Sequence, residues 1–160
     1  MAQDIFIKIN GIDGESQDSS HKGEIEVSSW GWRVEQQSSM HSGSGGGAGK
    51  ATAADLSFEH LVDRASPNLV KYCLTGKHID QVVLTVRKAG GNPLEFFKIT
   101  MSDVLVTLVA PSASNTDTGI REQVNLSFAA VKQEYVVQNA QGGSGGAVTA
   151  AYSFKENKES

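Results

Sequence analysis

The amino-acid sequence predicts a mainly β fold with a single short helix and an extended glycine-rich loop. In about eight separate segments, apolar side chains alternate with polar ones, which is the pattern of half-buried strands. Only one segment, near residues 66–75, has the apolar spacing of a helix. Many of the 17 glycines gather in two stretches, at 38–53 and 139–147. Short strands at this spacing favour a sandwich or a closed barrel.

The N-terminal part of the chain is predicted to form two strands joined by a turn. In the segment DIFIKIN three isoleucines share one face, and the asparagine and glycines of NGIDGES suit the turn that follows. The second strand spans residues 24–36. Its alternation places Trp30 and Trp32 on one face, which we expect to meet the core because these are its largest apolar side chains. A further strand is expected at 54–62.

The helix is predicted at residues 66–75 from its boundary residues. Ser66 suits the N-cap, Pro67 suits the first helical position, and Gly76 suits the left-handed C-terminal end. Since about nine residues are marginal for an isolated helix, we expect this one to dock on a sheet. The side chains expected to face that sheet are Leu69, Val70, Cys73 and Leu74.

The rest of the chain returns to strand patterns separated by turn residues. The last long strand is expected to be bent or bulged because of its length. The strands are expected at residues 82–88, 94–101, 103–109, 123–137 and 147–155, with a second glycine-rich loop before the last of them.

Composition excludes several classes of function. The formal net charge of −4 argues against a nucleic-acid partner, which selects a basic face. The one cysteine, Cys73, cannot form an internal disulfide, which suits synthesis in a reducing compartment. The start of the chain lacks the basic and apolar regions of a signal peptide, and no apolar run is long enough to span a bilayer. We therefore expect a protein made in the cytoplasm, without membrane insertion, and, if it is secreted, one that leaves the cell without a cleaved signal.

Motifs for catalysis or cofactor binding are weak. The stretch SGGGAGKA approaches a phosphate-binding loop, but Ser44 and Ala51 stand where that motif needs a glycine and a hydroxyl. The four histidines, at positions 21, 41, 60 and 78, are scattered, so we expect ordinary surface or strand histidines and no zinc site. No nucleophile lies beside a base in a recognisable pattern, and we predict no enzyme, no cofactor and no metal.

The glycine-rich stretch 38–53, SSMHSGSGGGAGKATA, interrupts the middle of the predicted domain. Flexible linkers usually lie between domains, and ordering glycine costs conformational entropy. We expect an arm that another backbone can approach closely, and hence a contact with a neighbouring subunit. A passive surface hairpin is the alternative.

The sequence resembles the haemolysin-coregulated protein (Hcp) family, the tube-forming component of bacterial type VI secretion. The resemblance runs nearly end to end, although it is less sharp after residue 138. Each matching segment is weak evidence alone, whereas the whole set in one order is specific. The segments are DIFIKINGIDGES, HKGEIEVSSWGW, GGGAGKATAADLSF, SPNLVKYCLTGKHI, LTVRKAGGNPLEFFKI, DVLV and VNLSFAAVKQEY.

The resemblance implies a structural role. It implies a two-sheet β-barrel flanked by one helix, in a single domain over residues 1–160 without an appended toxin domain. It further implies a homohexameric ring with a central pore, and stacked rings that form a tube inside a contractile sheath. The tube carries a spike protein of the valine-glycine repeat family and is expelled with small effector proteins in its pore. No catalytic residue follows from it.

Two sets of residues are predicted to serve such a tube. Ser29, Gly31 and Arg33 lie opposite the tryptophans and are predicted to line the pore. In the arm, Met40 is expected to pack and Lys50 to stay solvated. The predicted contact residues are Met40, His41, Gly45, Gly46, Gly47 and Lys50. The competing hypothesis is a monomeric β-sandwich that binds a ligand in the manner of a lectin.

Overall fold

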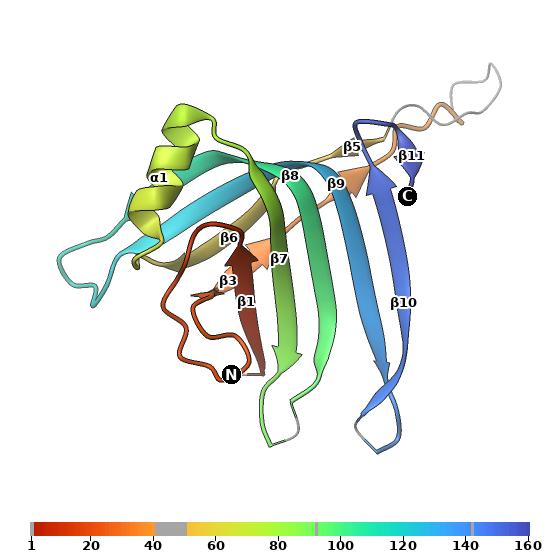
Figure 1. The fold of residues 1–160 in the computed structure, drawn as a ribbon, viewed down its shortest axis with the longest axis horizontal. Coiled ribbons are helices and arrows are strands. Elements are labelled where there is room, and N and C mark those ends of the chain that lie inside the picture. The colour runs from red at the N-terminus through yellow and green to blue at the C-terminus, as the bar shows by residue number, and fades with distance from the viewer. Residues whose placement is uncertain (1, 41–50, 92, 142) are drawn as a thin grey trace.

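The computed structural model describes residues 1–160 except 1, 41–50, 92 and 142. The described residues form one α-helix and a set of strands that lie side by side in a strongly curved sheet (Figure 1). In chain order these elements are β1 (Gln3–Ile9), β2 (Ile25–Glu26), β3 (Ser29–Gly31), β4 (Val34–Glu35), β5 (Thr52–Ala53), β6 (Leu56–Leu61), α1 (Ser66–Thr75), β7 (Ile79–Lys88), β8 (Glu95–Ser112), β9 (Arg121–Gln138), β10 (Ser144–Ser153) and β11 (Lys158–Glu159).

The main sheet has nine strands, and β9 is the point at which it divides. Its main path runs in the order β11-β10-β9-β8-β7-β1-β2, and all the pairs that the structure registers are antiparallel. The first part of β9 pairs with β6 from Arg121 to Leu126, and β6 in turn pairs with β3. The second part of β9, from Ala130 onward, pairs with β10 instead. One strand therefore belongs to two diverging parts of the sheet.

The segment predicted as one strand over 24–36 is three short strands. β2 pairs with β1, whereas β3 pairs with β6 on the other part of the sheet. Between them the chain crosses over: Val27 N–H donates to the carbonyl of Ile5 at 2.9 Å, and Ser28 N–H donates to the carbonyl of Glu59 at 2.8 Å. The alternation of buried side chains shifts by one residue at this bend, because Ile25 and Val27 lie in the core before it and Trp30 and Trp32 pack against the core after it.

The strands predicted at 94–101 and 103–109 are one strand, β8. The backbone stays extended through this region although Asp103 has a φ of +53°. β9 has the length predicted for it, but the nearby bulge lies on its partner. The pairing steps from Val106–Leu126 to Leu108–Asn125, which leaves Thr107 as the extra residue of β8.

The helix α1 begins and ends where the sequence predicts, but its N-cap differs. Ala65 occupies the N-cap position without a side-chain cap hydrogen bond, and Ser66 is already helical. Gly76 closes the helix in the left-handed conformation, with its N–H donating to Tyr72 at 2.9 Å. The predicted apolar stripe is only partly buried: Leu69 is fully buried, whereas Val70 and Leu74 are exposed. The helix packs beside β8 through Leu69.

The core lies inside the curve of the sheet, and it comes from alternate residues of the long strands. The fully buried members include Ile7, Leu56, Phe58, Leu69, Val82, Leu84, Ile99, Met101, Val124 and Leu126. The predicted mainly β fold with one short helix is confirmed. The finer prediction was a barrel made of two sheets. In the described residues the sheet does not close into a barrel, because β2 and β3 do not pair with each other.

Candidate functional site

The segment around β3 presents two different faces. Trp30 and Trp32 are half-buried and pack against the core. The Trp30 ring stacks on Phe97 with 5.7 Å between centroids, and Trp32 lies 5.8 Å from the ring of Phe128. The indole N–H of Trp32 donates to the carbonyl of Ala54 at 2.8 Å. The tryptophans therefore occupy the face that the sequence assigned to them.

The opposite face of this segment is open. Ser29, Gly31 and Arg33 are all exposed, and a Cβ built on Gly31 would have no other atom within 4 Å. The Arg33 guanidinium forms an exposed ion pair with Glu35 at 3.3 Å. The structure thus brings the three predicted pore-lining residues together on one accessible face, with room for larger side chains at Gly31.

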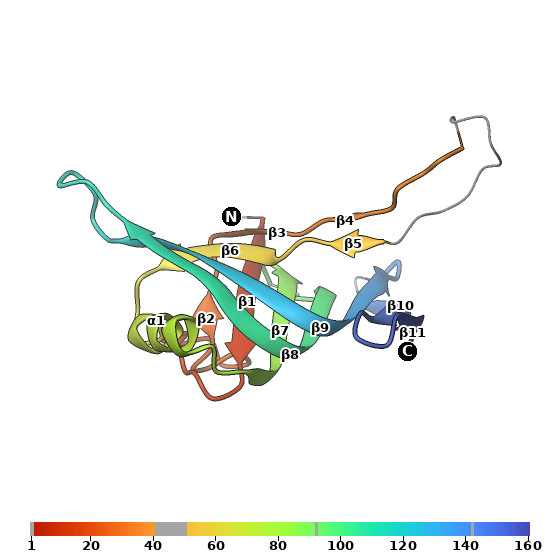
Figure 2. The same cartoon turned by 90° about the horizontal axis from the view of Figure 1, so that it is seen from above.

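The flanks of the glycine-rich stretch form a separate two-stranded hairpin. β4 pairs with β5 through Val34–Ala53 and Glu35–Thr52. Figure 2 shows this hairpin extending away from the rest of the fold. Met40 is 69% exposed, so none of the residues that the structure describes covers it. The other predicted contact residues, His41, Gly45, Gly46, Gly47 and Lys50, lie outside the described residues.

The strand β10 is an exposed edge that the sequence analysis did not identify. β10 pairs with β9 on one side, whereas β11 covers the other side only opposite Tyr152 and Ser153. From Ser144 to Ala150 the strand is exposed, and Val148 is 65% exposed. Its sequence, SGGAVTAAYS, carries no charge. Natural sheet edges usually carry charges or bulges that prevent pairing with another chain. This edge has a bulge between Ser144 and Ala147 but no charge, so its part from Ala147 to Ala150 is suited to a partner.

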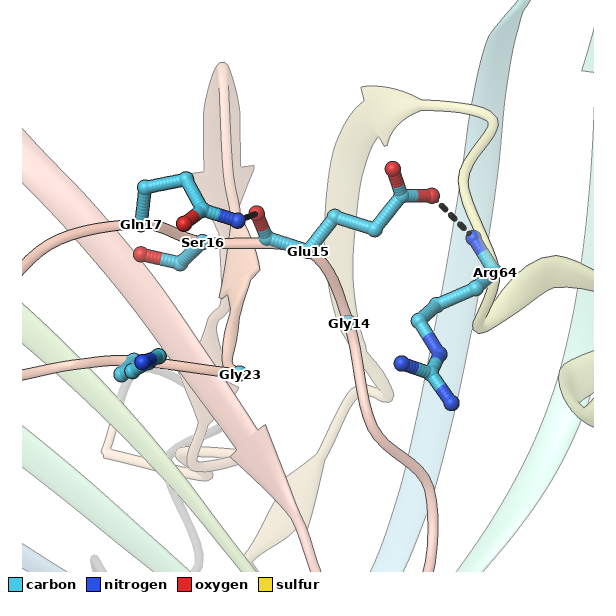
Figure 3. Close-up of a pocket in the computed structure, with 7 residues that line it drawn as sticks. Gly14, Glu15, Ser16, Gln17, Gly23 and Arg64 are labelled. Atoms are coloured by element: carbon cyan, nitrogen blue, oxygen red, sulfur yellow. Dashed lines mark hydrogen bonds between the residues drawn. The ribbon is translucent and has the colours of Figure 1, made fainter.

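A surface hollow of about 590 Å³ lies beside the loop that follows β1 (Figure 3). The Glu15 carboxylate accepts a hydrogen bond from the backbone N–H of Arg64 at 2.6 Å, and the Gln17 amide donates to the carbonyl of Glu15 at 3.4 Å. The Arg64 guanidinium points away from that carboxylate. The Ser16 hydroxyl accepts a hydrogen bond from the N–H of Asp18 at 3.2 Å, and no base lies beside it among the residues that line the hollow.

Two histidines that were predicted as ordinary surface or strand residues are buried in polar networks. His60 is 1% exposed, and its Nε2 lies 2.8 Å from Glu122, which is 2% exposed. The Ser66 hydroxyl donates to the same carboxylate oxygen at 2.9 Å. Because serine and histidine both contact the glutamate rather than each other, this cluster is not a nucleophile–base pair. These hydrogen bonds connect Ser66 at the start of α1 to His60 on β6 through Glu122 on β9.

The second network holds the loop after β1 against the sheet. The Phe6 ring lies between His21, stacked at 4.4 Å, and the guanidinium of Arg87 at 5.0 Å. His21 contacts Glu24 at 3.0 Å and Glu95 at 2.7 Å. Arg87 donates to Asp18 at 2.8 Å and to Asp4 at 3.0 Å.

Two carboxyl groups in these regions have shifted pKa values. The hydrogen bond from Arg87 lowers the pKa of Asp18 to about 2, against the desolvation that opposes it. Burial raises the pKa of Asp63, which lies close to Glu15 and Glu122 at the start of α1. The Asp18 shift arises from a contact that holds the fold together, and the Asp63 shift arises from its burial at the start of α1.

The described part of the chain contains no group of three or more metal-ligating side chains placed to hold an ion. Within the same residues, α1 is neither long nor apolar enough to cross a bilayer.

Comparison with known proteins identifies the class to which this fold belongs. Residues 6–135 match the family model described as "Type VI secretion system effector, Hcp". Protein hcp1 of Pseudomonas aeruginosa is 44% identical over 159 residues, which cover 98% of each chain. These matches define a non-enzymatic, secreted structural component of type VI secretion.

Solved structures agree over the whole chain. The crystal structure of Hcp1 from Salmonella typhimurium is 56% identical, with a TM-score of 0.85 and full coverage of both chains. The type VI secretion system effector from Yersinia pestis is 41% identical, with a TM-score of 0.78, and the match covers 94% of this chain and 99% of that one. The chain belongs to the Hcp family, the tube proteins of the type VI secretion system.

Proposed function

We propose that this chain is the repeating subunit of a homohexameric ring, and that such rings stack into the tube of a type VI secretion system. The observation that carries the proposal is the match to the Hcp family over almost the entire chain. Residues 1–160 act as a single tube domain. The subunit is made in the cytoplasm, leaves the cell without a cleaved signal, and meets the sheath and the spike protein as partners.

Three exposed surfaces support an assembly role. The uncharged edge of β10, the hairpin of β4 and β5, and the open face of Ser29, Gly31 and Arg33 all lie outside the core. In the ring, the third of these surfaces lines the pore, where small effector proteins are sheltered. The hairpin contacts a neighbouring subunit or ring.

Light scattering coupled to size-exclusion chromatography tests the ring. We expect a particle of six times 17.0 kDa, about 102 kDa. A monomer at all concentrations and salt levels would contradict the proposal and favour the lectin-like binding module.

Replacement of Gly31 by glutamine tests the pore. Gly31 has space for a side chain and a φ that other residues adopt, so we expect Gly31→Gln to leave ring formation intact and to reduce cargo retention. Gly91→Gln is the matched control, because Gly91 also has no atom within 4 Å of a built Cβ and lies in the turn before β8. Loss of folding in Gly31→Gln, or equal retention in both variants, would remove this face from the pore.

A further inference from the structure

A groove of about 550 Å³ lies between β1, the crossing from β2 to β3, and the end of β6. One wall is apolar: Leu61 is 60% exposed, Val62 is 38% exposed, and Ile5 lies half-buried beside them. Exposed leucine and valine side by side on a groove wall lose contact with water when a partner covers them, which is favourable at about 25 cal/mol per Å² of apolar surface.

The backbone of β1 is open along this groove. β2 pairs with β1 only at Phe6 and Ile7, and Val27 makes the last backbone contact to Ile5 before the chain crosses to β6. Gln3 and Asp4 therefore have β7 on one side and no described strand on the other. An extended chain can add to such a free edge through main-chain hydrogen bonds.

The groove is also strongly acidic. Asp4, Glu15, Glu26 and Asp63 line it, and none of the described lining residues is a lysine or an arginine. Arg87 compensates Asp4 from outside the groove at 3.0 Å, whereas Glu26 is exposed and has no ion pair among the described residues. Burial raises the pKa of Asp63, and the nearby charges of Glu15 and Glu122 raise it further. These carboxylates therefore repel one another at this end of the groove.

We propose that this groove is a docking site for an extended segment of a different protein that carries lysine or arginine between apolar residues. Its apolar side chains lie on Leu61 and Val62, its cations lie beside Glu26 and Asp63, and its backbone runs along the open side of Gln3 and Asp4. The described residues that line this groove include none of the three pore-face residues and none from the hairpin or β10.

Three capped synthetic peptides test the two chemical requirements against the full-length protein by fluorescence anisotropy. The peptides are Lys-Leu-Lys-Leu-Lys, Glu-Leu-Glu-Leu-Glu and Lys-Ser-Lys-Ser-Lys. We expect the first to bind, the second not to bind, and the third to bind more weakly because it lacks apolar contacts. Binding of the first should weaken as salt screens the carboxylates.

Substitutions at exposed positions then locate the binding. Leu61→Ser and Glu26→Gln alter solvent-exposed side chains and should preserve the fold. Each should weaken the lysine–leucine peptide about fivefold, the effect of losing roughly 1 kcal/mol. The matched controls are Leu74→Ser, an exposed leucine on α1, and Asp80→Asn, an exposed carboxylate on β7. Both should bind as the unaltered protein does.

Each remaining outcome overturns the proposal. Absence of binding excludes the site, and equal affinity in all variants indicates general attraction to an acidic protein. A change in particle mass on Leu61→Ser, measured by light scattering, assigns the groove to contact between copies of this chain instead. Hexamer formation is measured separately, by light scattering of the unaltered protein. A failure to form the hexamer can therefore be distinguished from a failure to bind the peptide.

Discussion

His60 and His78 both contact carboxylates, but of the two only His60 is buried. His60 lies 2.8 Å from Glu122, and His78 lies 2.7 Å from Asp103 at a site where its side chain is 64% exposed. Removal of His60 leaves the buried Glu122 carboxylate with the Ser66 hydroxyl as its remaining partner, so His60→Ala should lower the free energy of unfolding by about 3 kcal/mol, the low end of the range for breaking a buried pair. The exposed pair should contribute about 1 kcal/mol or less, as measured with His78→Ala. Urea unfolding of both variants checks this, and equal losses would contradict it.

The pairing of Asp18 with Arg87 makes part of the stability dependent on pH. The pKa of Asp18 is lowered from the ordinary 3.8 to about 2, so its contribution is fully present above pH 4. It is lost as the pH falls from about 4 to about 2, where the folded protein also takes up the proton. The difference in urea midpoint between the unaltered protein and Asp18→Asn should therefore shrink over this range.

Asp80→Asn is the control for that titration, because Asp80 is exposed on β7. Its urea midpoint should follow that of the unaltered protein at every pH. A difference for Asp18→Asn that stays constant down to pH 2 would show that the charge of Asp18 is not its source.

The burial of His60 could have been read from the sequence, but its role could not. Alternation places His60 on the same face as Leu56 and Phe58, and it places Glu122 on the same face as Val124 and Leu126. Only the register of β6 against β9 puts the two residues opposite each other. That register joins positions 62 residues apart, and no local pattern specifies it.

Among the elements, the hairpin formed by β4 and β5 is predicted to be separable from the fold. No core residue comes from the described residues 33–40 and 51–53, and β4 pairs only with β5 among the described strands. Deletion of Gly43–Gly49 should therefore leave the melting temperature almost unchanged, while stacking of rings and secretion fall. Thermal melts, ring size and tube formation in the same variant check this. Normal tubes and normal secretion would identify the arm as a passive loop.

The elements with local signals were predicted well, and those with long-range causes were not. Pro67 and Gly76 fix the limits of α1 because their backbone preferences act locally. The prediction of Ser66 as the N-cap residue was wrong. The Ser66 hydroxyl donates instead to Glu122, which lies on the distant strand β9. The crossing at Val27 and Ser28 was also missed, because it is fixed by bonds to Ile5 and Glu59.

For the whole molecule, net charge opposes the proposed assembly. Each subunit carries −4, so a hexamer carries six times −4, or −24. Association also costs on the order of 4–15 kcal/mol in lost freedom, so each interface should bury well above about 1,000 Å² through apolar and backbone contacts.

Salt dependence distinguishes the forces in such a ring. If apolar and backbone contacts dominate, raising the ionic strength toward 0.15 M, where the Debye length is about 8 Å, should increase the hexamer fraction by screening repulsion. Mass photometry of a dilution series at several salt concentrations measures this fraction. Dissociation by added salt would show that ion pairs between subunits dominate instead.

The bare edge of β10 also affects the subunit before it assembles. An uncharged strand with free main-chain groups is a template on which another free edge can pair, including that of a newly made copy in the wrong orientation. We therefore expect productive assembly to compete with aggregation while that edge is uncovered. On this view, solubility in the producing cell depends on how quickly a newly folded copy meets its proper neighbours.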